Sequence, residues 1–429
     1  MSSTPTNRPS SRRRLIENLF SLYLLQGLNY LIPMAVLPYL IRVLGVEVYG
    51  LVAFSQAFAL YFVLFTDYGF NYSATRFIAK HKDCPQDICE MFWRVYILKF
   101  GFLVIGIFVL GVLTLVVPRF RHDSPYFLWA YLAVLGNVLF PQWYFQGVEK
   151  MKYISVCTGI AKILSAAFLF IWVRHPQDGV LAVIFQSGGV LIAGVLGFVI
   201  ALREIRGRFV LPSIESLWVT LCDGWHLFVS MAAISLYTNT NLVLVGLLAG
   251  NVQAGYFSAA EKLVRAMCGV ISPVTQVFFP RVNSLLSESK EMALRFLFKS
   301  LRITSLVTLV FSLLILFLAE PIVHLLFGGS GSGSIAIVRW IAFLPFIIAV
   351  SNVFAAQAMI PFGMDRLLSR ILLFAGIMNI LIAVVFIKAF AAVGAGISVL
   401  VTESFVTITT GFVFYRIIVP TTTFEASAT

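Results

Sequence analysis

The sequence predicts an all-α polytopic membrane protein with twelve transmembrane helices in two six-helix lobes, related by a pseudo-two-fold axis along the membrane normal. Three observations predict this fold class. The 429 residues are 60% hydrophobic and 12% charged, with a mean hydropathy of +0.94, so lipid is the expected solvent for most of the chain. Apolar segments of about 20 residues recur along the sequence. A short pattern also repeats in its two halves.

Each apolar segment is long enough to cross the hydrocarbon core of a bilayer as a helix, which takes about 20 residues. The segments are 17–41, 47–70, 92–117, 126–147, 153–173, 179–202, 224–249, 252–279, 296–319, 335–360, 367–388 and 392–415. The seventh and eighth are the least certain to be separate, because they carry polar groups and are joined by a very short connection. An even number of spans puts both ends of the chain on one side.

The basic residues alternate between the two sides of this arrangement. The side that holds the N-terminus carries 22 of the 31 basic residues, with Arg94 and Lys99 among them, and the opposite side carries six. The positive-inside rule therefore predicts cytoplasmic tails at 1–14 and 417–429. This distribution also explains the net charge of +12 by membrane topology and not by nucleic-acid binding.

An internal repeat is expected between "LGVEVYGLVAFSQ" (44–56) and "AGNVQAGYFSAAE" (249–261). An offset of 205 aligns four pairs: Gly45 with Gly250, Gly50 with Gly255, Gln56 with Glu261, and Arg76 with Arg281. Chance is the alternative reading, because glycines are common in membrane helices. The shared position between the first and second span of each half favours a repeat. It predicts an N-lobe at 15–208 (helices 1–6) and a C-lobe at 209–416 (helices 7–12), with a cavity between them.

Charged residues lie deep inside the eighth predicted span, in "YFSAAEKLVRAM" (256–267). Glu261 lies about 13 Å below the outer end of that span at 1.5 Å per residue, and Arg265 shares its helix face four residues later. Lys262 points about 100° away from that face. Charges at this depth are costly in lipid. They either form a structural pair that locks this helix to a neighbour or line a hydrated cavity.

Other polar side chains inside spans admit the same two readings, since they can bind a ligand or form hydrogen bonds between helices. The candidate substrate-binding residues of the cavity are Lys162, Lys262, Arg265, Arg76, Arg281, Asn239, Asn241 and Gln56. The candidates for ion coupling or gating are the carboxylates Glu261, Glu403 and Asp67.

Sequence motifs for catalysis or ATP binding are absent. The chain has no P-loop, no G-x-G-x-x-G after a strand, no H-E-x-x-H and no paired C-x-x-C. Its five cysteines show no metal-ligand spacing and are expected to be free. We therefore expect no enzymatic activity, no metal and no cofactor. The expected energy source is a coupling cation, proton or sodium, or the gradient of the substrate itself.

Two stretches, 23–79 ("YLLQGLNYLIPMAV…") and 339–366 ("RWIAFLPFIIAV…"), resemble O-antigen and polysaccharide repeat-unit flippases of the Wzx type. These belong to the multidrug/oligosaccharidyl-lipid/polysaccharide exporter superfamily. The resemblance implies two six-helix lobes that open alternately to either face of a bacterial inner (plasma) membrane. The implied substrate is a polyprenyl-pyrophosphate-linked oligosaccharide, moved from the cytoplasmic to the periplasmic leaflet. Membrane lipid and a polysaccharide polymerase complex are candidate partners.

Three other functions are alternatives to this one. A multidrug or small-solute cation antiporter of the same superfamily would want a more acidic cavity, whereas the cations and carboxylates within the spans are balanced here. A membrane-embedded polymerase or glycosyltransferase would need a large soluble loop or a carboxylate cluster at the aqueous face, and the sequence has neither. A scaffold without transport activity would leave the charges inside the spans unexplained.

Overall fold

The computed structural model describes residues 11–205 and 209–420, and every regular element in these ranges is a helix. Seven segments within them are long and apolar enough to cross a membrane. The all-α class and the multi-pass membrane character are therefore confirmed, while the count of twelve stays a prediction. The tail residues 1–10 and 421–429 of the predicted cytoplasmic ends lie outside the described residues.

Two very long helices are each divided by a backbone kink. Helix α1 (Ser11–Asp67) has 57 residues and is interrupted at Gly45, which adopts φ 76° and ψ 164°. Helix α14 (Asp365–Val413) is interrupted at Ala391, with φ 50°. A straight helix of 57 residues would be about 85 Å long, far more than a bilayer core. Both kinks fall in connections that the sequence predicts between successive spans.

The rest of the N-terminal part is made of shorter helices. They are α2 (Phe70–Lys80), α3 (Pro85–Val116), α4 (Pro118–His122), α5 (Ser124–Leu139), α6 (Gln142–Gly147), α7 (Met151–Trp172), η1 (Pro176–Asp178) and α8 (Gly179–Ile205). The predicted span 126–147 is split into α5 and α6, because Pro141 forces Phe140 into an extended conformation.

The C-terminal part begins with two long helices, α9 (Ile214–Leu248) and α10 (Asn251–Glu288). After them come α11 (Lys290–Phe327), η2 (Gly329–Gly331), α12 (Ser334–Ile341), α13 (Leu344–Asn352), η3 (Val353–Met359), α14 and η4 (Phe414–Ile418). Helix α9 begins ten residues before the predicted span at 224, since the Ser213 side chain accepts a hydrogen bond from the backbone N–H of Ser216 and caps it. Much of the predicted loop 203–223 is therefore helical.

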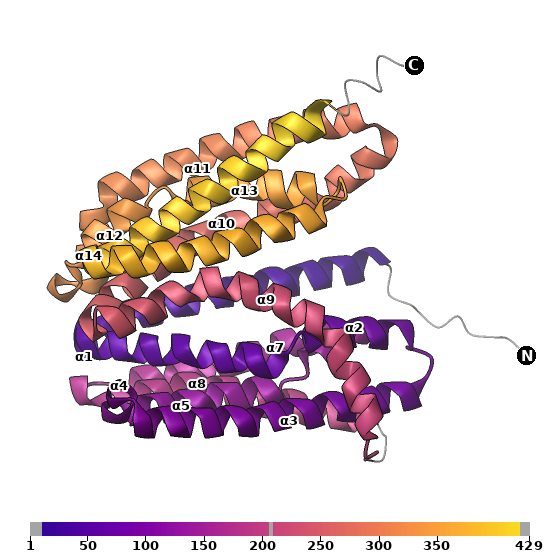
Figure 1. Cartoon of the computed structure of the whole chain (residues 1–429), viewed down its shortest axis with the longest axis horizontal. Helices are drawn as coiled ribbons and strands as arrows, with labels where there is room; N and C mark the ends of the chain where they lie inside the picture. Colours follow the sequence, from indigo (N-terminus) through magenta and orange to yellow (C-terminus); the bar gives the residue numbers. More distant parts are fainter. Residues whose placement is uncertain (1–10, 206–208, 421–429) are drawn as a thin grey trace, which may run out of the picture.

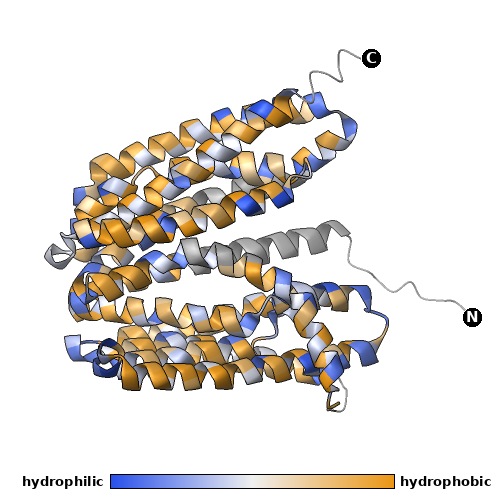
Figure 2. Ribbon diagram, in the orientation of Figure 1, coloured by the Kyte–Doolittle hydropathy of each residue, from blue (hydrophilic) through white to orange (hydrophobic). Residues whose placement is uncertain are grey.

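The helices form two groups that diverge toward one end of the molecule (Figure 1). Helices α1 to α8 make one group, α10 to α14 make the other, and α9 runs between them. The described chain begins and ends at the diverging end. Apolar residues cover the middle of the helices and polar residues gather at both ends, as a bilayer requires (Figure 2).

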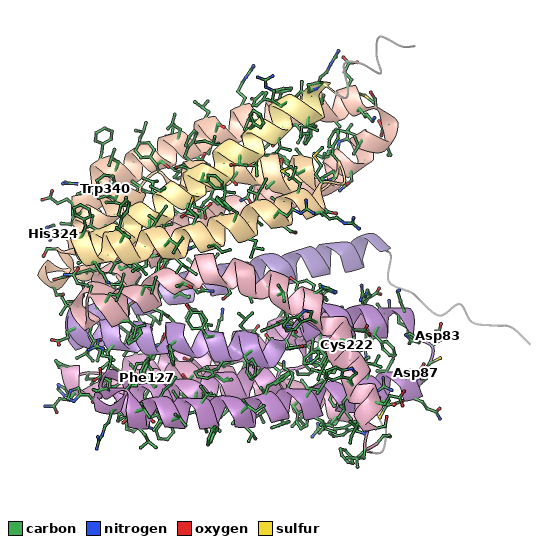
Figure 3. The ribbon with its side chains drawn as sticks, in the orientation of Figure 1. Asp83, Asp87, Phe127, Cys222, His324 and Trp340 are labelled. Atoms are coloured by element: carbon green, nitrogen blue, oxygen red, sulfur yellow. The ribbon has the colours of Figure 1, made fainter. Side chains whose placement is uncertain are left out.

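Loops predicted on opposite sides of the membrane lie at opposite ends of the molecule. Asp83, Asp87 and Cys222 mark the end where the chain begins, and His324 and Trp340 mark the other end (Figure 3). This agrees with the predicted alternation of connections. Which end faces the cytoplasm stays a prediction.

The two groups cross most closely where α1 meets α10. A Cβ on Gly50 would lie 1.9 Å from the carbonyl oxygen of Asn251, and one on Gly255 would lie 2.2 Å from that of Val46. These residues correspond at the offset of 205, so the contact is reciprocal, as it is about a local two-fold axis. Gly45 and Gly250, which precede it, both have positive φ, 76° and 89°. We call the bends at Gly45 and Gly250 the two elbows.

Replacing Gly50 with alanine should destabilise the protein by about 1–3 kcal/mol, because the added methyl group forces two backbones apart. The thermal midpoint of the purified variant in detergent measures this effect. Gly101→Ala is the matched control, since no atom lies within 4 Å of a Cβ at that position. Equal midpoints for the two variants would contradict the close crossing.

Candidate functional site

A cavity of about 420 Å³ lies between helices of both groups, α1, α5, α8, α9 and α10. Polar or charged side chains reach its lining from each of these helices: Gln56, Asn137, Gln186, Ser187, Thr238, Asn239, Glu261, Lys262 and Arg265. Five of them belong to the residues that the sequence nominates, namely Gln56, Asn239, Glu261, Lys262 and Arg265. Glu261, Lys262 and Arg265 of α10 therefore line a cavity between helices.

Glu261 and Arg265 are paired within that cavity. Arg265 Nε donates to Glu261 Oε1 at 2.9 Å, and the Arg265 side chain is 41% exposed. Among the described contacts of Arg265 this bond engages Nε, which leaves the two Nη groups to donate to a ligand. Glu403 of α14 also interacts electrostatically with Arg265. Arg265 is thus bonded to a carboxylate of its own helix and interacts electrostatically with a second one on α14.

Lys262 stands against an aromatic ring at the helix crossing. Its Nζ lies 5.4 Å from the centroid of Tyr49, a distance typical of a cation–π interaction. The Tyr49 hydroxyl in turn shares a buried hydrogen bond of 3.1 Å with Ser258 Oγ. Although Lys262 lies about 100° around the helix from Glu261, it lines the same cavity, because the cavity curves around α10.

Two neighbouring cavities continue the first one. A cavity of about 340 Å³ contains Lys162 of α7 and shares Asn137 and Gln186 with the first. A more apolar cavity of about 240 Å³ lies against the Pro33–Pro38 turns of α1 and shares Lys262 and Arg265. The three lysine and arginine side chains predicted inside the spans therefore line three adjoining cavities that share lining residues, and we call these three the connected cavities.

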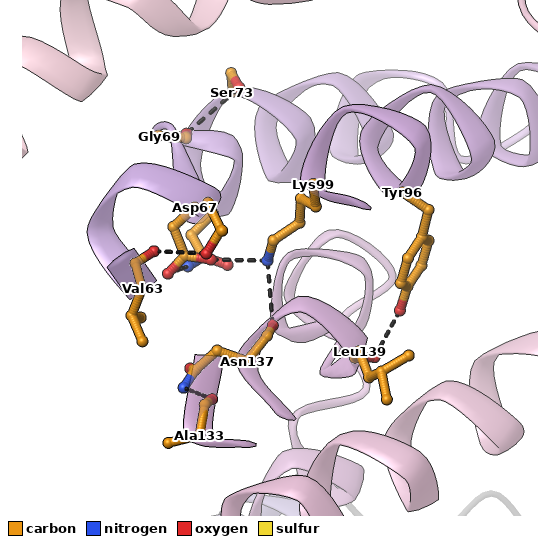
Figure 4. Close-up of polar contacts among 11 residues, drawn as sticks. Val63, Asp67, Gly69, Ser73, Tyr96, Lys99, Ala133, Asn137 and Leu139 are labelled. Atoms are coloured by element: carbon orange, nitrogen blue, oxygen red, sulfur yellow. Dashed lines mark hydrogen bonds and ion pairs between the residues drawn. The ribbon is translucent and has the colours of Figure 1, made fainter. Parts of the chain in front are cut away.

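Asp67 does not line these cavities but forms a buried ion pair with Lys99 (Figure 4). Lys99 Nζ lies 2.7 Å from Asp67 Oδ1 and donates to the carbonyl oxygen of Asn137 at 3.2 Å. Lys99 is 1% exposed, so its assignment to a cytoplasmic connection is wrong. Its place within the apolar segment 92–117 was the signal that it needs a partner inside the membrane. Because the Asn137 side chain lines two cavities, the ion pair lies directly behind their wall.

Glu403 is not among the residues that line these cavities, and three other nominated residues lie elsewhere. Asn241 is buried between α9 and α14, donating to Asn379 Oδ1 at 3.2 Å and accepting from Ser398 Oγ at 3.1 Å. Arg76 is exposed on α2 beside a separate pocket of about 250 Å³, and Arg281 is exposed near the end of α10. None of the three is among the residues that line the connected cavities. Asn241 makes the interhelical hydrogen bonds that its alternative reading describes.

Bundled membrane helices around a cavity lined by charged side chains are typical of membrane transporters. The fold is similar to two solved members of that class. One is the lipid II flippase MurJ in an inward closed conformation, with a TM-score of 0.67 and 15% identity over 92% of this chain and 87% of that one. The other is an inward-facing multidrug resistance MATE family transporter of the MOP superfamily, with a TM-score of 0.63 and 15% identity over 92% of this chain and 95% of that one.

The chain belongs to the family described as polysaccharide biosynthesis protein, which matches residues 15–286. A relative from Escherichia coli (strain K12), named as an O-antigen transporter, is 34% identical over 403 residues, which are 94% of this chain and 96% of the relative. The resemblance stated from the sequence is thereby confirmed. The prediction of a transporter and not an enzyme is confirmed by the function for which the relative is named. The predicted coupling cation stays a prediction.

Proposed function

We propose that the protein flips a polyprenyl-pyrophosphate-linked oligosaccharide, an O-antigen-type repeat unit, from the cytoplasmic to the periplasmic leaflet. The observation that carries this proposal is the alignment of Lys162, Lys262 and Arg265 along connected cavities. A pyrophosphate needs cationic donors, and an arginine with free Nη groups can engage it in a bidentate way. The names of the relative and of MurJ support a lipid-linked substrate.

The uncharged part of the lining suits a sugar. Gln56, Asn137, Gln186 and Asn239 offer both donors and acceptors to hydroxyl groups. The apolar cavity beside Pro33 and Leu37 offers a place for the first part of the lipid chain next to the cations. A multidrug or small-solute cation antiporter is the second candidate, and the carboxylates Glu261 and Glu403 favour it. Each of them lies next to Arg265, however, which weakens their attraction for an organic cation.

The proposed architecture is twelve helices in two lobes, 15–208 and 209–416, that alternate in opening to either face of a bacterial inner membrane, with both termini cytoplasmic. The kinks at Gly45 and Ala391 support the count, because they divide α1 and α14 into two crossings each. The reciprocal contact of Gly50 and Gly255 supports the pseudo-two-fold axis.

Ion coupling is proposed to act through Arg265. A phosphate that turns the guanidinium toward itself displaces the Glu261 carboxylate from Nε, and Glu403 competes with the phosphate through its charge. A proton or sodium ion that binds the displaced carboxylate would favour the substrate-bound state. Asp67 is a third candidate, but its pairing with Lys99 already neutralises it.

Reconstitution in vesicles tests the proposed function. Vesicles that contain the protein and a fluorescent polyprenyl-pyrophosphate oligosaccharide should expose the sugar to a membrane-impermeant glycosidase faster than vesicles without protein. Dissipating a proton or sodium gradient should slow this exposure if coupling exists, and an unchanged rate would exclude that ion. Transport of a lipophilic cation without any exposure of the sugar would instead establish the antiporter.

A further inference from the structure

Two arginines connect the helix groups at the end opposite to where the described chain begins. Arg42 precedes the first elbow, and its Nε donates to the carbonyl oxygen of Leu326 at 2.9 Å. Its Nη2 donates to the carbonyl oxygen of Leu325. Both acceptors belong to the last turn of α11, where backbone carbonyls have no partner within the helix. Arg42 therefore caps a helix of the other group.

Arg119 makes the corresponding connection in the opposite sense. It lies in α4, directly after α3, and its Nη2 donates to Asn251 Oδ1 and, at 3.3 Å, to the carbonyl oxygen of Gly246. Gly246 belongs to the last turn of α9, and Asn251 follows the second elbow at Gly250. The guanidinium carbon also lies 5.9 Å from the ring centroid of Phe54. Arg119 thus caps a helix end at the other elbow.

The two connections are matched in position. Arg42 joins the elbow at Gly45 to the carboxyl end of α11. Arg119, directly after α3, joins the end of that helix to the elbow at Gly250. Each arginine donates to a carbonyl oxygen at a helix carboxyl end, where the helix dipole favours a cation, and Arg119 also donates to the Asn251 side chain at the start of α10. Arg42 follows the predicted span 17–41 and Arg119 follows the predicted span 92–117, so both are predicted on the side opposite to the N-terminus, the outer side.

We propose that Arg42 and Arg119 are a pair of latches that hold the helix groups together at this end, and that both must release before the cavity opens there. This inference rests on the alternating access of the proposed function. The chemistry suits a reversible latch, because water can take over as donor to a helix-end carbonyl once the arginine withdraws. A direct arginine–carboxylate pair would leave a negative charge behind, whereas these acceptors are neutral.

The helix crossing connects the latches with the cavity. Tyr49 lies next to Gly50, bonds Ser258 across the crossing, and carries Lys262 over its ring. An anionic group that draws Lys262 toward the cavity removes the cation from Tyr49 and so weakens the crossing between the two elbows. Occupation of the cavity is thereby transmitted to the helix ends that the arginines cap.

Side-specific labelling of a cavity cysteine tests the latches. Leu60 lines the first cavity and is 45% exposed, so Leu60→Cys is introduced after the native cysteines are replaced by serine. A membrane-impermeant maleimide is applied from each side of the membrane in turn. In the double variant Arg42→Ala/Arg119→Ala, labelling from the latch side should rise about tenfold, which corresponds to about 1.4 kcal/mol of lost closing free energy.

Arg121→Ala is the matched control, since Arg121 is exposed in the same short helix as Arg119 and has no described side-chain contact. It should leave labelling from both sides unchanged. If the double variant does not accumulate, Asn251→Ala removes one acceptor of Arg119 and should raise labelling from the latch side by a smaller factor. Unchanged labelling in a folded variant overturns the latches. The assay needs no substrate, so failure of the flipping assay with increased labelling refutes the proposed function alone.

Discussion

Replacing Arg265 with alanine should abolish export of the lipid-linked oligosaccharide while the protein remains in the membrane. Arg265 is the cavity cation with a planar fork of donors, and it is paired with Glu261. Its removal deletes the bidentate contact with the pyrophosphate and leaves the Glu261 carboxylate in the cavity without its cation. Truncating one partner of such a charge pair costs about 2–5 kcal/mol, which corresponds to a loss of about 30-fold or more in binding.

The initial rate of sugar exposure in vesicles measures this loss, with the amount of protein determined by immunoblot. Arg265→Lys keeps the charge but not the fork, so an intermediate rate is expected. Arg370→Ala is the control, because Arg370 is exposed on α14 and has no described side-chain partner. A rate for Arg265→Ala equal to that of the control would remove Arg265 from the substrate site.

Replacing Lys99 with methionine should destabilise the protein by up to about 3–5 kcal/mol, since it leaves the half-buried Asp67 carboxylate without its cation. The ion pair is short, 2.7 Å, and Lys99 is 1% exposed. The same change at Lys82, which pairs with Glu149 on the surface, should cost about 1 kcal/mol or less. Thermal unfolding in detergent compares the two variants.

The double variant Asp67→Asn/Lys99→Met separates packing from transport at this pair. It removes both charges, so much of the lost stability should return. If stability returns and transport does not, the pair takes part in transport beyond its structural role. A Lys99→Met variant as stable as Lys82→Met would contradict the buried ion pair.

Hydropathy predicted the membrane class and a break between successive spans at the positions of both kinks, because these depend on residues that are near each other in the sequence. Gly45 and Gly250 lie in two of the predicted connections, where the structure has the elbows. The kink at Ala391 lies in the predicted connection between the last two apolar segments. Two helix ends differ from the predicted boundaries, and each has a local cause in the sequence. Pro141 ends α5 before the predicted boundary, and Ser213 starts α9 within a predicted loop.

The candidate site was predicted less well, since it depends on contacts between distant residues. Lys99 and Lys162 both lie in apolar segments, and only the folded chain pairs Lys99 with Asp67 and places Lys162 at a cavity. Asn239 and Asn241 are two residues apart, yet one lines the cavity and the other bonds α14. The sequence does not predict the contacts of Arg42 and Arg119, because most of their acceptors are backbone carbonyls, which no motif reveals.

The size of the first cavity limits how much of a substrate its lining residues can contact. A volume of about 420 Å³ lies within the range of pockets for drug-sized ligands and is small for a chain of several sugar rings. On the proposed function, only the phosphates and the innermost sugar would be inspected, while outer sugars extend into water. Mutations in glycosyltransferases that alter those outer sugars would then diversify the cell surface without any matching change in this protein.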